Sequence, residues 1–316
     1  MLDEELRQNG PPDTFDNTML QKECGCPREL YWFLRGIDYR VSPPYFAWGR
    51  AWGAGLNAFY ECDESLEIRM LIGLKAATAL WEAESPEGRV NDTLENLQRV
   101  FTQYAQCYGR ENWTQGKEHG ELGFAFPIPG TQIYYAGAID AYIEWPGYGA
   151  LLREDKTTGG YLTPNFQGYW MHASQVTGYL WALAQILGEV PFGALINMAS
   201  KRKSKNMEDQ FARNMPMKSE WQLNEFMRDT VEIADRIRKR WDTGTTVGSY
   251  PNWLWPKLGE RIYLKCSGGA GTSPCLYNSL CAVEADPWVL DETYDYEDEY
   301  SIRSEKWAPW ERKGDT

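Results

Sequence analysis

The sequence predicts an α/β (α+β) fold in which a central mixed sheet is flanked by helices. Helix-forming patterns fill residues 26–34, 46–61, 64–84 and 93–108 before the first expected strand at 123–128. Two strands, a helix, a strand starting at 192 and a long helix ending at Trp241 then follow. Strands that alternate with helices in this way favour one sheet enclosed between helical layers.

The expected domain organisation is simple. A chain of 316 residues is long enough to bury a large core. We expect a flexible segment over residues 1–20, one domain over 21–285 and an acidic tail over 286–316. Within the domain, a helical layer spans 21–115, a core with the candidate site spans 116–245, and a cysteine region spans 246–285.

Residues 134–157 have the pattern of a β-hairpin. The segments 134–142 and 150–157 are rich in β-branched and aromatic residues, and Gly147 and Gly149 mark a turn between them. We therefore expect two antiparallel strands joined by a short turn.

Three side chains of this hairpin are expected to meet. Because side chains alternate along a strand, Glu154 and Lys156 share a face while Asp155 points away, and Asp140 on the partner strand faces the same point. Asp140 and Glu154 would bind a hard cation such as Mg²⁺ or Mn²⁺, with the carbonyl of Asp155 as a further ligand. Lys156 would orient or help deprotonate a water that attacks a phosphodiester. The alternative is a solvated face without a function.

Downstream, residues 165–187 are expected to form a helix that ends at Gly188. Gln175 and Tyr179 lie four residues apart and therefore on one face of this helix. The series Asp140, then Glu154-Asp-Lys156, then Gln175-x-x-x-Tyr179 resembles the PD-(D/E)XK nuclease superfamily, in particular its RecB-like branch. The resemblance spans roughly residues 17–281.

The resemblance implies a restriction-endonuclease-like sheet and a metal-dependent DNA exonuclease that acts in DNA-end processing, recombination or repair. It implies that Gln175 and Tyr179 contact DNA or brace the metal-binding face. It also makes Glu121, in a segment similar to the acidic strand before the catalytic hairpin, an additional candidate ligand. It points to a phage or bacterial protein whose expected partners are DNA ends or single strands, together with a recombinase or helicase.

One departure concerns histidine. Many relatives carry a metal-binding histidine in an early helix, where this chain has Gly53. The chain holds only His119 and His172, and neither lies in a matching context. The chain is therefore also compatible with weak metal binding, or with a catalytically inactive, nuclease-fold subunit that binds DNA or another protein.

Cysteines give a second signal. Clustered cysteines in a cytosolic chain suggest metal or cluster ligation rather than disulfides. Cys26 resembles the upstream cysteine of the iron-sulfur nucleases in this superfamily, and Cys266, Cys275 and Cys281 resemble their C-terminal group. The resemblance implies a structural [4Fe-4S] cluster. A structural Zn²⁺ and reduced cysteines without metal are the alternatives, and Cys24 is an alternative to Cys26.

The charge and the aromatic content bear on DNA binding. A formal charge of −13 argues against broad adhesion to nucleic acid, but basic residues concentrate at 201–205 and 236–240. Fifteen tryptophans, including Trp253, Trp255, Trp307 and Trp310, offer candidates for stacking on unpaired bases, although most tryptophans belong to cores.

The expected location is the cytoplasm, or the host cytoplasm for a phage protein. No apolar stretch approaches transmembrane length, and the polar, acidic start does not resemble a signal peptide. We therefore expect no membrane partner.

Overall fold

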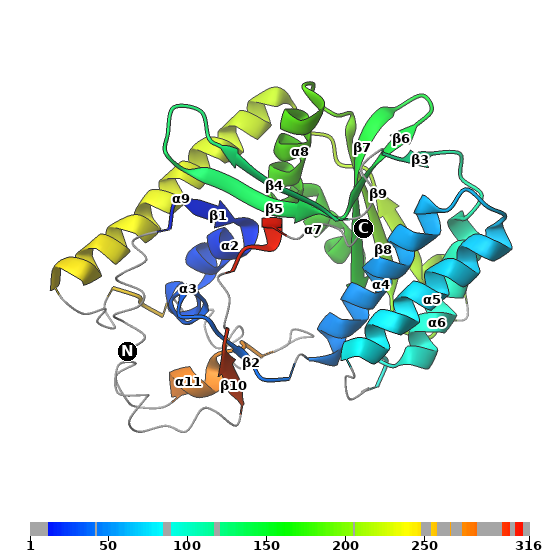
Figure 1. Cartoon of the computed structure of the whole chain (residues 1–316), viewed down its shortest axis with the longest axis horizontal. Coiled ribbons are helices and arrows are strands. Elements are labelled where there is room, and N and C mark those ends of the chain that lie inside the picture. Colours follow the sequence, from blue (N-terminus) through cyan, green and yellow to red (C-terminus); the bar gives the residue numbers. More distant parts are fainter. Residues whose placement is uncertain are drawn as a thin grey trace. The chain divides into compact units, whose positions relative to one another are not determined.

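The structure is a computed structural model, and Figure 1 shows the order of its elements. It describes residues 12–41, 43–84, 90–116, 121–204, 206–247, 254–257, 266, 274–282, 299–303 and 307–311. The chain forms two compact units, each assembled from separate segments. Unit 1 contains residues 1–41, 125–136 and 227–308, and unit 2 contains residues 42–124, 137–226 and 309–316.

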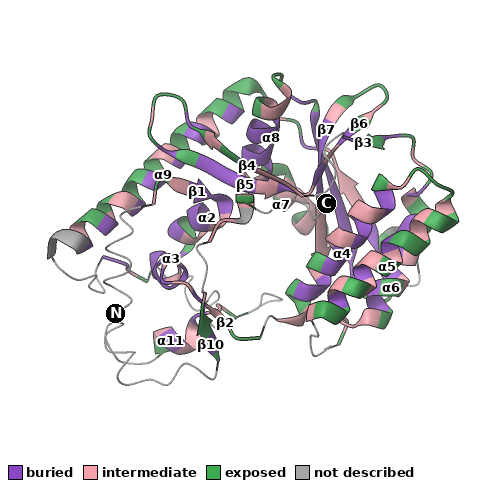
Figure 2. Cartoon of the chain, viewed as in Figure 1, coloured by how far each residue is buried: buried purple, intermediate pink, exposed green. Residues whose placement is uncertain are grey.

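Unit 2 is built on a five-stranded mixed sheet of order β3-β6-β7-β8-β9. Its strands are β3 (Thr114–Gln115), β6 (Ala141–Trp145), β7 (Gly149–Thr158), β8 (Gly193–Ser200) and β9 (Phe211–Asn214). β6 and β7 form the predicted antiparallel hairpin, while β7 and β8 run parallel. Every residue of β8 is buried, as expected for a central strand covered on both faces (Figure 2).

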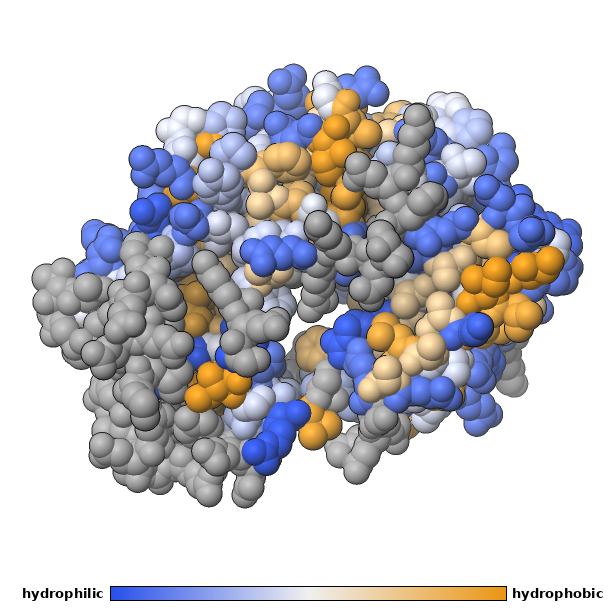
Figure 3. All heavy atoms as spheres, viewed as in Figure 1, coloured by the Kyte–Doolittle hydropathy of each residue, from blue (hydrophilic) through white to orange (hydrophobic). Residues whose placement is uncertain are grey.

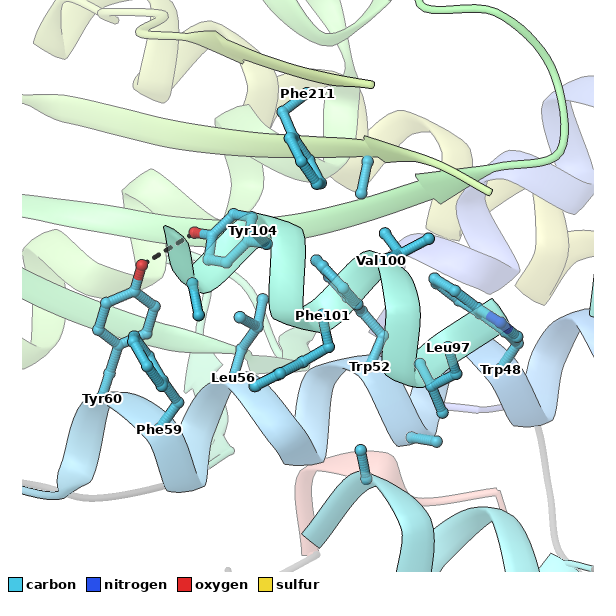
Figure 4. Close-up of a cluster of buried hydrophobic side chains, with 14 of the residues drawn as sticks. Trp48, Trp52, Leu56, Phe59, Tyr60, Leu97, Val100, Phe101, Tyr104 and Phe211 are labelled. Carbon is cyan, nitrogen blue, oxygen red and sulfur yellow. Dashed lines mark hydrogen bonds between the residues drawn. The ribbon is translucent and has the colours of Figure 1, made fainter. Parts of the chain in front are cut away.

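Three helices cover one face of this sheet: α4 (Pro44–Glu61), α5 (Leu66–Glu84) and α6 (Leu94–Tyr108). Their aromatic side chains interlock over the sheet, and Trp52 contacts both Phe101 and Tyr104 edge-on (Figure 4). Ile143 of β6, Leu151 of β7 and Phe211 of β9 complete this core. Interlocked aromatic rings therefore dominate the core of this layer.

Two helices pack on the other side, α7 (Pro164–His172) and α8 (Ser174–Leu187). α8 contacts β7 and β8 and is largely buried from Val176 to Leu183. It ends at Gly188, whose φ of +76° is a left-handed conformation that glycine adopts without strain. The predicted mixed α/β fold with helices flanking a mixed sheet is confirmed.

Unit 1 contains β1 (Thr14–Asp16), α2 (Asn17–Gly25), α3 (Pro27–Leu34), β2 (Ile37–Tyr39), α11 (Asn278–Ala282) and β10 (Tyr300–Ile302). β10 pairs antiparallel with β2, and β1 pairs parallel with the start of β5 (Tyr134–Ile139). Asp16 caps α2 by accepting the backbone N–H of Met19. The described part of the cysteine region, residues 254–257, 266 and 274–282, belongs to the same unit as the first helices of the chain.

Some segments belong to both units. β4 (Leu122–Pro127) and β5 each place residues in both, and they form a three-stranded sheet of order β1-β5-β4. The long α9 (Glu220–Val247) also begins in unit 2 and continues in unit 1. A capping box precedes it, in which Ser219 and Gln222 exchange hydrogen bonds of 3.0 Å and 3.4 Å. Two short 3₁₀ helices, η1 (Met207–Asp209) and η2 (Pro309–Glu311), complete the described elements.

Two predicted elements are each divided in the structure. The sequence predicts one strand over 134–142, but β5 ends at Ile139, Asp140 forms a bend, and β6 begins a different sheet. Aspartate favours such a break because its side chain competes for backbone hydrogen bonds. The helix predicted over 165–187 is interrupted at Ala173, whose ψ of 128° is not helical.

The ends of the chain are also more structured than expected. Residues 14–20, which the sequence assigns to a flexible segment, form β1 and the start of α2. Residues 300–302, in the expected acidic tail, form β10. Phe15 is fully buried, which explains why this segment is held in place.

The exposed side of α5 carries Ile68, Leu71 and Ile72, and apolar side chains gather on this part of the surface in Figure 3. Among the described residues, no helix is both long and apolar enough to span a membrane.

Candidate active site

Asp140 lies where the chain passes from β5 to β6. Its Oδ2 accepts a hydrogen bond of 2.9 Å from the backbone N–H of Asp155 on β7. Ala141 pairs with Arg153 in the antiparallel ladder, so Asp140 lies beside Glu154 at the end of that ladder. The carboxyl group of Asp140 is thus fixed against the neighbouring strand by a main-chain donor.

Glu154, Lys156 and Gln175 form one hydrogen-bonded group between β7 and α8. Lys156 Nζ contacts Glu154 Oε1 in an ion pair, and it donates to Gln175 Oε1 at 3.2 Å. Gln175 Nε2 donates to Glu154 Oε1 at 3.0 Å. The predicted face of β7, with Glu154 and Lys156 together, is therefore present, and Gln175 binds both of them.

One oxygen of this group has no partner. Glu154 is 1% exposed, and its Oε2 is buried without a hydrogen bond from any described residue. A buried carboxylate oxygen without a donor is costly, because it has lost its hydration. The position is therefore suited to a cation or to a donor on a bound molecule.

Burial disfavours the charged form of both carboxyl groups. Burial raises the pKa of Asp140 well above its usual range, and the neighbouring Glu154 raises it further. Burial likewise raises the pKa of Glu154, with smaller contributions from Asp155 and Glu121. Burial alone would lower the pKa of Lys156, but the carboxylates of Glu154 and Asp140 outweigh it, so its pKa is raised and it stays charged. When both carboxyl groups are ionised, their negative charge exceeds the single positive charge of Lys156.

Trp170 of α7 is a residue of this site that the sequence reasoning missed. Lys156 Nζ lies 4.8 Å from the centre of its ring, and Tyr169, which is 53% exposed, packs edge-on against the same ring. A ring face near an ammonium stabilises its charge. The signal in the sequence was the aromatic run ahead of Gln175, which we had read only as part of a helix.

Tyr179 and Glu121 lie at the border of the site. Tyr179 is buried and packs edge-on against Phe124 of β4, with ring centres 5.8 Å apart. Glu121 is half-buried and close enough to Glu154 to affect its pKa. Glu121 therefore lies near the site, and the ring of Tyr179 packs against a neighbouring strand.

The opposite face of β7 carries Arg153 and Asp155. The Arg153 guanidinium is fully buried and donates to Asp155 Oδ2 at 3.1 Å and to Gln115 Oε1 at 3.0 Å. It also donates to Asn57 Oδ1 of α4. Asn197 Nδ2 of β8 donates to Asp155 Oδ1 at 2.9 Å. Asp155 therefore points away from Glu154, as predicted, and is fully paired.

Gly53 lies on α4 between two residues that face β7. A Cβ at Gly49 would lie 3.8 Å from Thr157 Oγ1, and Asn57 contacts Arg153, whereas a Cβ at Gly53 would meet no atom within 4 Å. The position is open to a larger side chain. His172 is exposed at the end of α7, and His119 lies outside the described residues.

The four candidate cysteines gather in unit 1. Cys26 is buried at the start of α3, and Cys266, Cys275 and Cys281 are half-buried. Burial raises the pKa of Cys275 to about 11, and the nearby thiols of Cys281 and Cys266 contribute to that rise.

Burial also raises the pKa of Cys281, and Cys26 contributes there. Cys24, the alternative to Cys26, is exposed and accepts a long hydrogen bond of 3.9 Å from Arg236. Cys26 lies near enough to Cys281 to raise its pKa, which favours Cys26 over Cys24 as the fourth thiol.

Some basic residues of the segments 201–205 and 236–240 are buried or form ion pairs within the protein. Lys201 is 4% exposed and bonds to Asp92 at 2.6 Å, and Arg240 pairs with Glu23. Arg202 and Lys203 are exposed.

The tryptophans considered for base stacking differ in their exposure and in their contacts within the protein. Trp255 is buried, Trp307 donates to Asp16 at 2.7 Å, and Trp310 is half-buried. Trp253 lies outside the described residues. Neither Trp255 nor Trp307 presents a free ring for a base.

Within the part of the chain that the structure describes, no group of three or more histidine, cysteine, aspartate or glutamate side chains is arranged to hold a metal ion.

No family model matches the chain, and no curated protein matches it. A solved structure described as "Crystal structure of SSO0001" is 15% identical, with 73% of this chain and 84% of that chain covered and a TM-score of 0.32. A likeness of this size supports no conclusion about activity.

Proposed function

We propose that the protein is a Mg²⁺- or Mn²⁺-dependent deoxyribonuclease that removes nucleotides from DNA ends. The observation that carries this proposal is the buried, unpartnered Oε2 of Glu154 beside a second carboxyl group, Asp140, and the ammonium of Lys156. An ion pair that only supported the fold would not require a second carboxylate whose charge is uncompensated.

Asp140 and Glu154 would hold the cation. Two carboxylates suit Mg²⁺ or Mn²⁺, which keep several waters and share their remaining positions with substrate phosphate. The bound cation would lower the pKa of a water and offset the charge that develops on the phosphodiester. Glu121 is near enough to add negative charge to the same site.

Lys156 would act on the reacting phosphate. Its raised pKa keeps the ammonium charged, so it stabilises negative charge on the phosphate oxygens and orients the attacking water. Gln175 holds Lys156 and Glu154 in fixed positions through hydrogen bonds to both. The Trp170 ring covers the ammonium on one side and excludes water there.

A surface for DNA lies at the same end of the sheet. The Arg202 guanidinium lies 4.3 Å from the centre of the Tyr161 ring and donates to its hydroxyl at 3.1 Å. Tyr161 is 68% exposed and follows β7 by three residues. An exposed cation and ring can contact a phosphate and an unpaired base without reading sequence, which suits an end-processing enzyme.

The cysteines would hold a structural metal centre in unit 1. The thiols of Cys26, Cys266, Cys275 and Cys281 would be the donor set of a [4Fe-4S] cluster, with Zn²⁺ as the alternative. In support, Cys281 and Cys266 raise the pKa of Cys275, and Cys26 raises that of Cys281. Its role would be to connect α3 to the C-terminal cysteines. Anaerobically purified protein that is brown with broad visible absorption would favour the cluster, and colourless protein with one zinc per chain would favour Zn²⁺.

The test of the proposed activity compares Lys156→Ala with the unchanged protein on labelled linear and circular DNA, with Mg²⁺ or Mn²⁺. We expect cleavage to fall by a factor of about 10² to 10⁴ while the protein still folds and binds DNA. Lys75→Ala removes an equal charge from the exposed side of α5 and should cleave normally. Equal cleavage by Lys156→Ala and the unchanged protein, in clean preparations, would refute the assignment.

A second candidate is a catalytically inactive subunit that binds DNA. Gly53, in the place of the histidine of many relatives, favours this reading. The unchanged protein would then bind linear DNA but release no nucleotides with either metal.

A further inference from the structure

The side chain of Asp155 is anchored behind the sheet while its backbone faces the candidate site. Its carboxylate binds Arg153 and Asn197 on the α4 side, and its N–H donates to Asp140 Oδ2 at 2.9 Å. We infer that Arg153, Asp155 and Asn197 are positioning residues, which set the place of the Asp140 carboxyl group through this N–H. The inference rests on the proposed function of Asp140 as a metal ligand.

The anchor is rigid because all three donating nitrogens of Arg153 are hydrogen-bonded. Arg153 is fully buried, and its three donating nitrogens reach side chains on three different elements: Asp155 on β7, Gln115 on β3 and Asn57 on α4. Its guanidinium also lies 5.2 Å from the centre of the Tyr60 ring. Charge-assisted hydrogen bonds of a fork-shaped group fix both distance and direction.

Asn197 supplies the second support from β8. Asp155 and Asn197 are paired in register across the parallel ladder, so their side chains share a face. The side chain of Asp155 is 2% exposed, and Asn197 is buried. The two oxygens of Asp155 therefore have separate donors, Arg153 for Oδ2 and Asn197 for Oδ1. With both oxygens held, the carboxylate cannot rotate.

The anchored backbone of β7 fixes the position of the Asp140 carboxyl group. Asp140 lies in a bend between two sheets and not inside a ladder, so fewer backbone bonds fix its position. The Asp155 N–H supplies that constraint, and a shift of Asp155 would move the carboxyl group away from Glu154. Residues that orient metal ligands from behind commonly change metal affinity by about 10- to 100-fold when altered.

Asn197→Leu tests the inference, because leucine has a similar size and no donor. We expect Mn²⁺ affinity, measured by calorimetry or by electron paramagnetic resonance, to fall by about 10-fold or more. The metal concentration for half-maximal cleavage should rise by the same factor, while the rate at saturating metal stays near that of the unchanged protein. A purely structural role would lower stability without this change in metal dependence.

A metal-free measurement makes the outcome independent of activity. In Asn197→Leu the amide proton of Asp155 should exchange with solvent faster, and its resonance should shift, because the hydrogen bond to Asp140 is weakened. Asn197→Ala serves as a second variant if leucine prevents folding. Asn96→Leu is the matched control, since Asn96 is a buried asparagine of α6 whose amide donates to the carbonyls of Asn91 and Lys201 and not to Asp155.

The outcomes are separable. A folded Asn197 variant with unchanged Mn²⁺ affinity and unchanged exchange at Asp155 would overturn the inference. If the unchanged protein neither binds Mn²⁺ nor cleaves DNA, the proposed function fails, and the exchange of the Asp155 amide alone then decides whether the anchor holds Asp140.

Discussion

The two faces of β7 differ in whether their buried charged groups are fully paired. On the α4 side, Arg153 and Asp155 are buried as a pair, and both oxygens of Asp155 accept hydrogen bonds. On the α8 side, Glu154 shares one ammonium with Asp140 and leaves its Oε2 without a donor. These residues alternate along one strand, so the difference comes from their surroundings and not from their chemical type.

The comparison separates a structural network from a candidate functional one. Buried charges that only support a fold are paired and hydrogen-bonded, because an unpaired buried charge is expensive. Surplus negative charge persists where a bound cation offsets it for part of the time. By this criterion the α4 side resembles a completed structure, and the α8 side resembles a binding site.

The largest expected effect is on the α4 side. Arg153→Met removes the guanidinium and leaves Asp155 buried without its countercharge, which should lower the free energy of unfolding by about 3–5 kcal/mol. Chemical unfolding measures this. The double variant Arg153→Met, Asp155→Leu removes both charges and should recover most of the loss. A single variant as stable as the unchanged protein would show that the pair is not as isolated from water as its burial indicates.

The α8 side should respond in the opposite direction, with a dependence on pH. The folded-state pKa values of Asp140 and Glu154 are raised, so the stability linked to these groups is present below their unfolded pKa near 4 and is lost as pH rises through the folded values. The double variant Asp140→Asn, Glu154→Gln lacks this loss. Without divalent metal, its advantage in melting temperature over the unchanged protein should therefore grow between about pH 5 and pH 8.

Adding Mn²⁺ should reverse that order. The metal would stabilise only the unchanged protein, since the amide variant has no carboxylates to bind it, and the effect should be larger at the higher pH. An advantage of the variant that stays constant with pH would contradict the electrostatic account of this face.

The smallest expected effects are on α4, which covers the paired face. Gly53→Ala adds a methyl group in open space and should stabilise the protein by about 0.4–1 kcal/mol. Gly55→Ala, on the same helix, would place its Cβ 2.8 Å from the Phe101 ring and 3.0 Å from Gly73 O, and should destabilise by about 1–3 kcal/mol. Thermal unfolding of the two variants compares them directly. Equal shifts would show that the Phe101 ring and α5 move aside to admit the Cβ at Gly55.

Much of the candidate site followed from the pattern of the chain. The period of two along a strand places Glu154 and Lys156 together and Asp155 apart, and helical spacing places Gln175 near Tyr179. These are local rules of backbone geometry, and the structure follows them. The bend at Asp140 and the break at Ala173 were missed, because short interruptions leave hydrophobic patterns almost unchanged.

The sequence by itself determined the order of the main helices and of the central strands β6, β7 and β8, and the sides of β7, because these depend on neighbours within a few residues. Only the tertiary structure decided that Arg153 meets Asn57 and Gln115, that Trp170 covers Lys156, and that Lys201 is buried against Asp92. These contacts join residues far apart in the chain, and burial changes their energies. No local pattern encodes which partner, or how much water, a charge will have after folding.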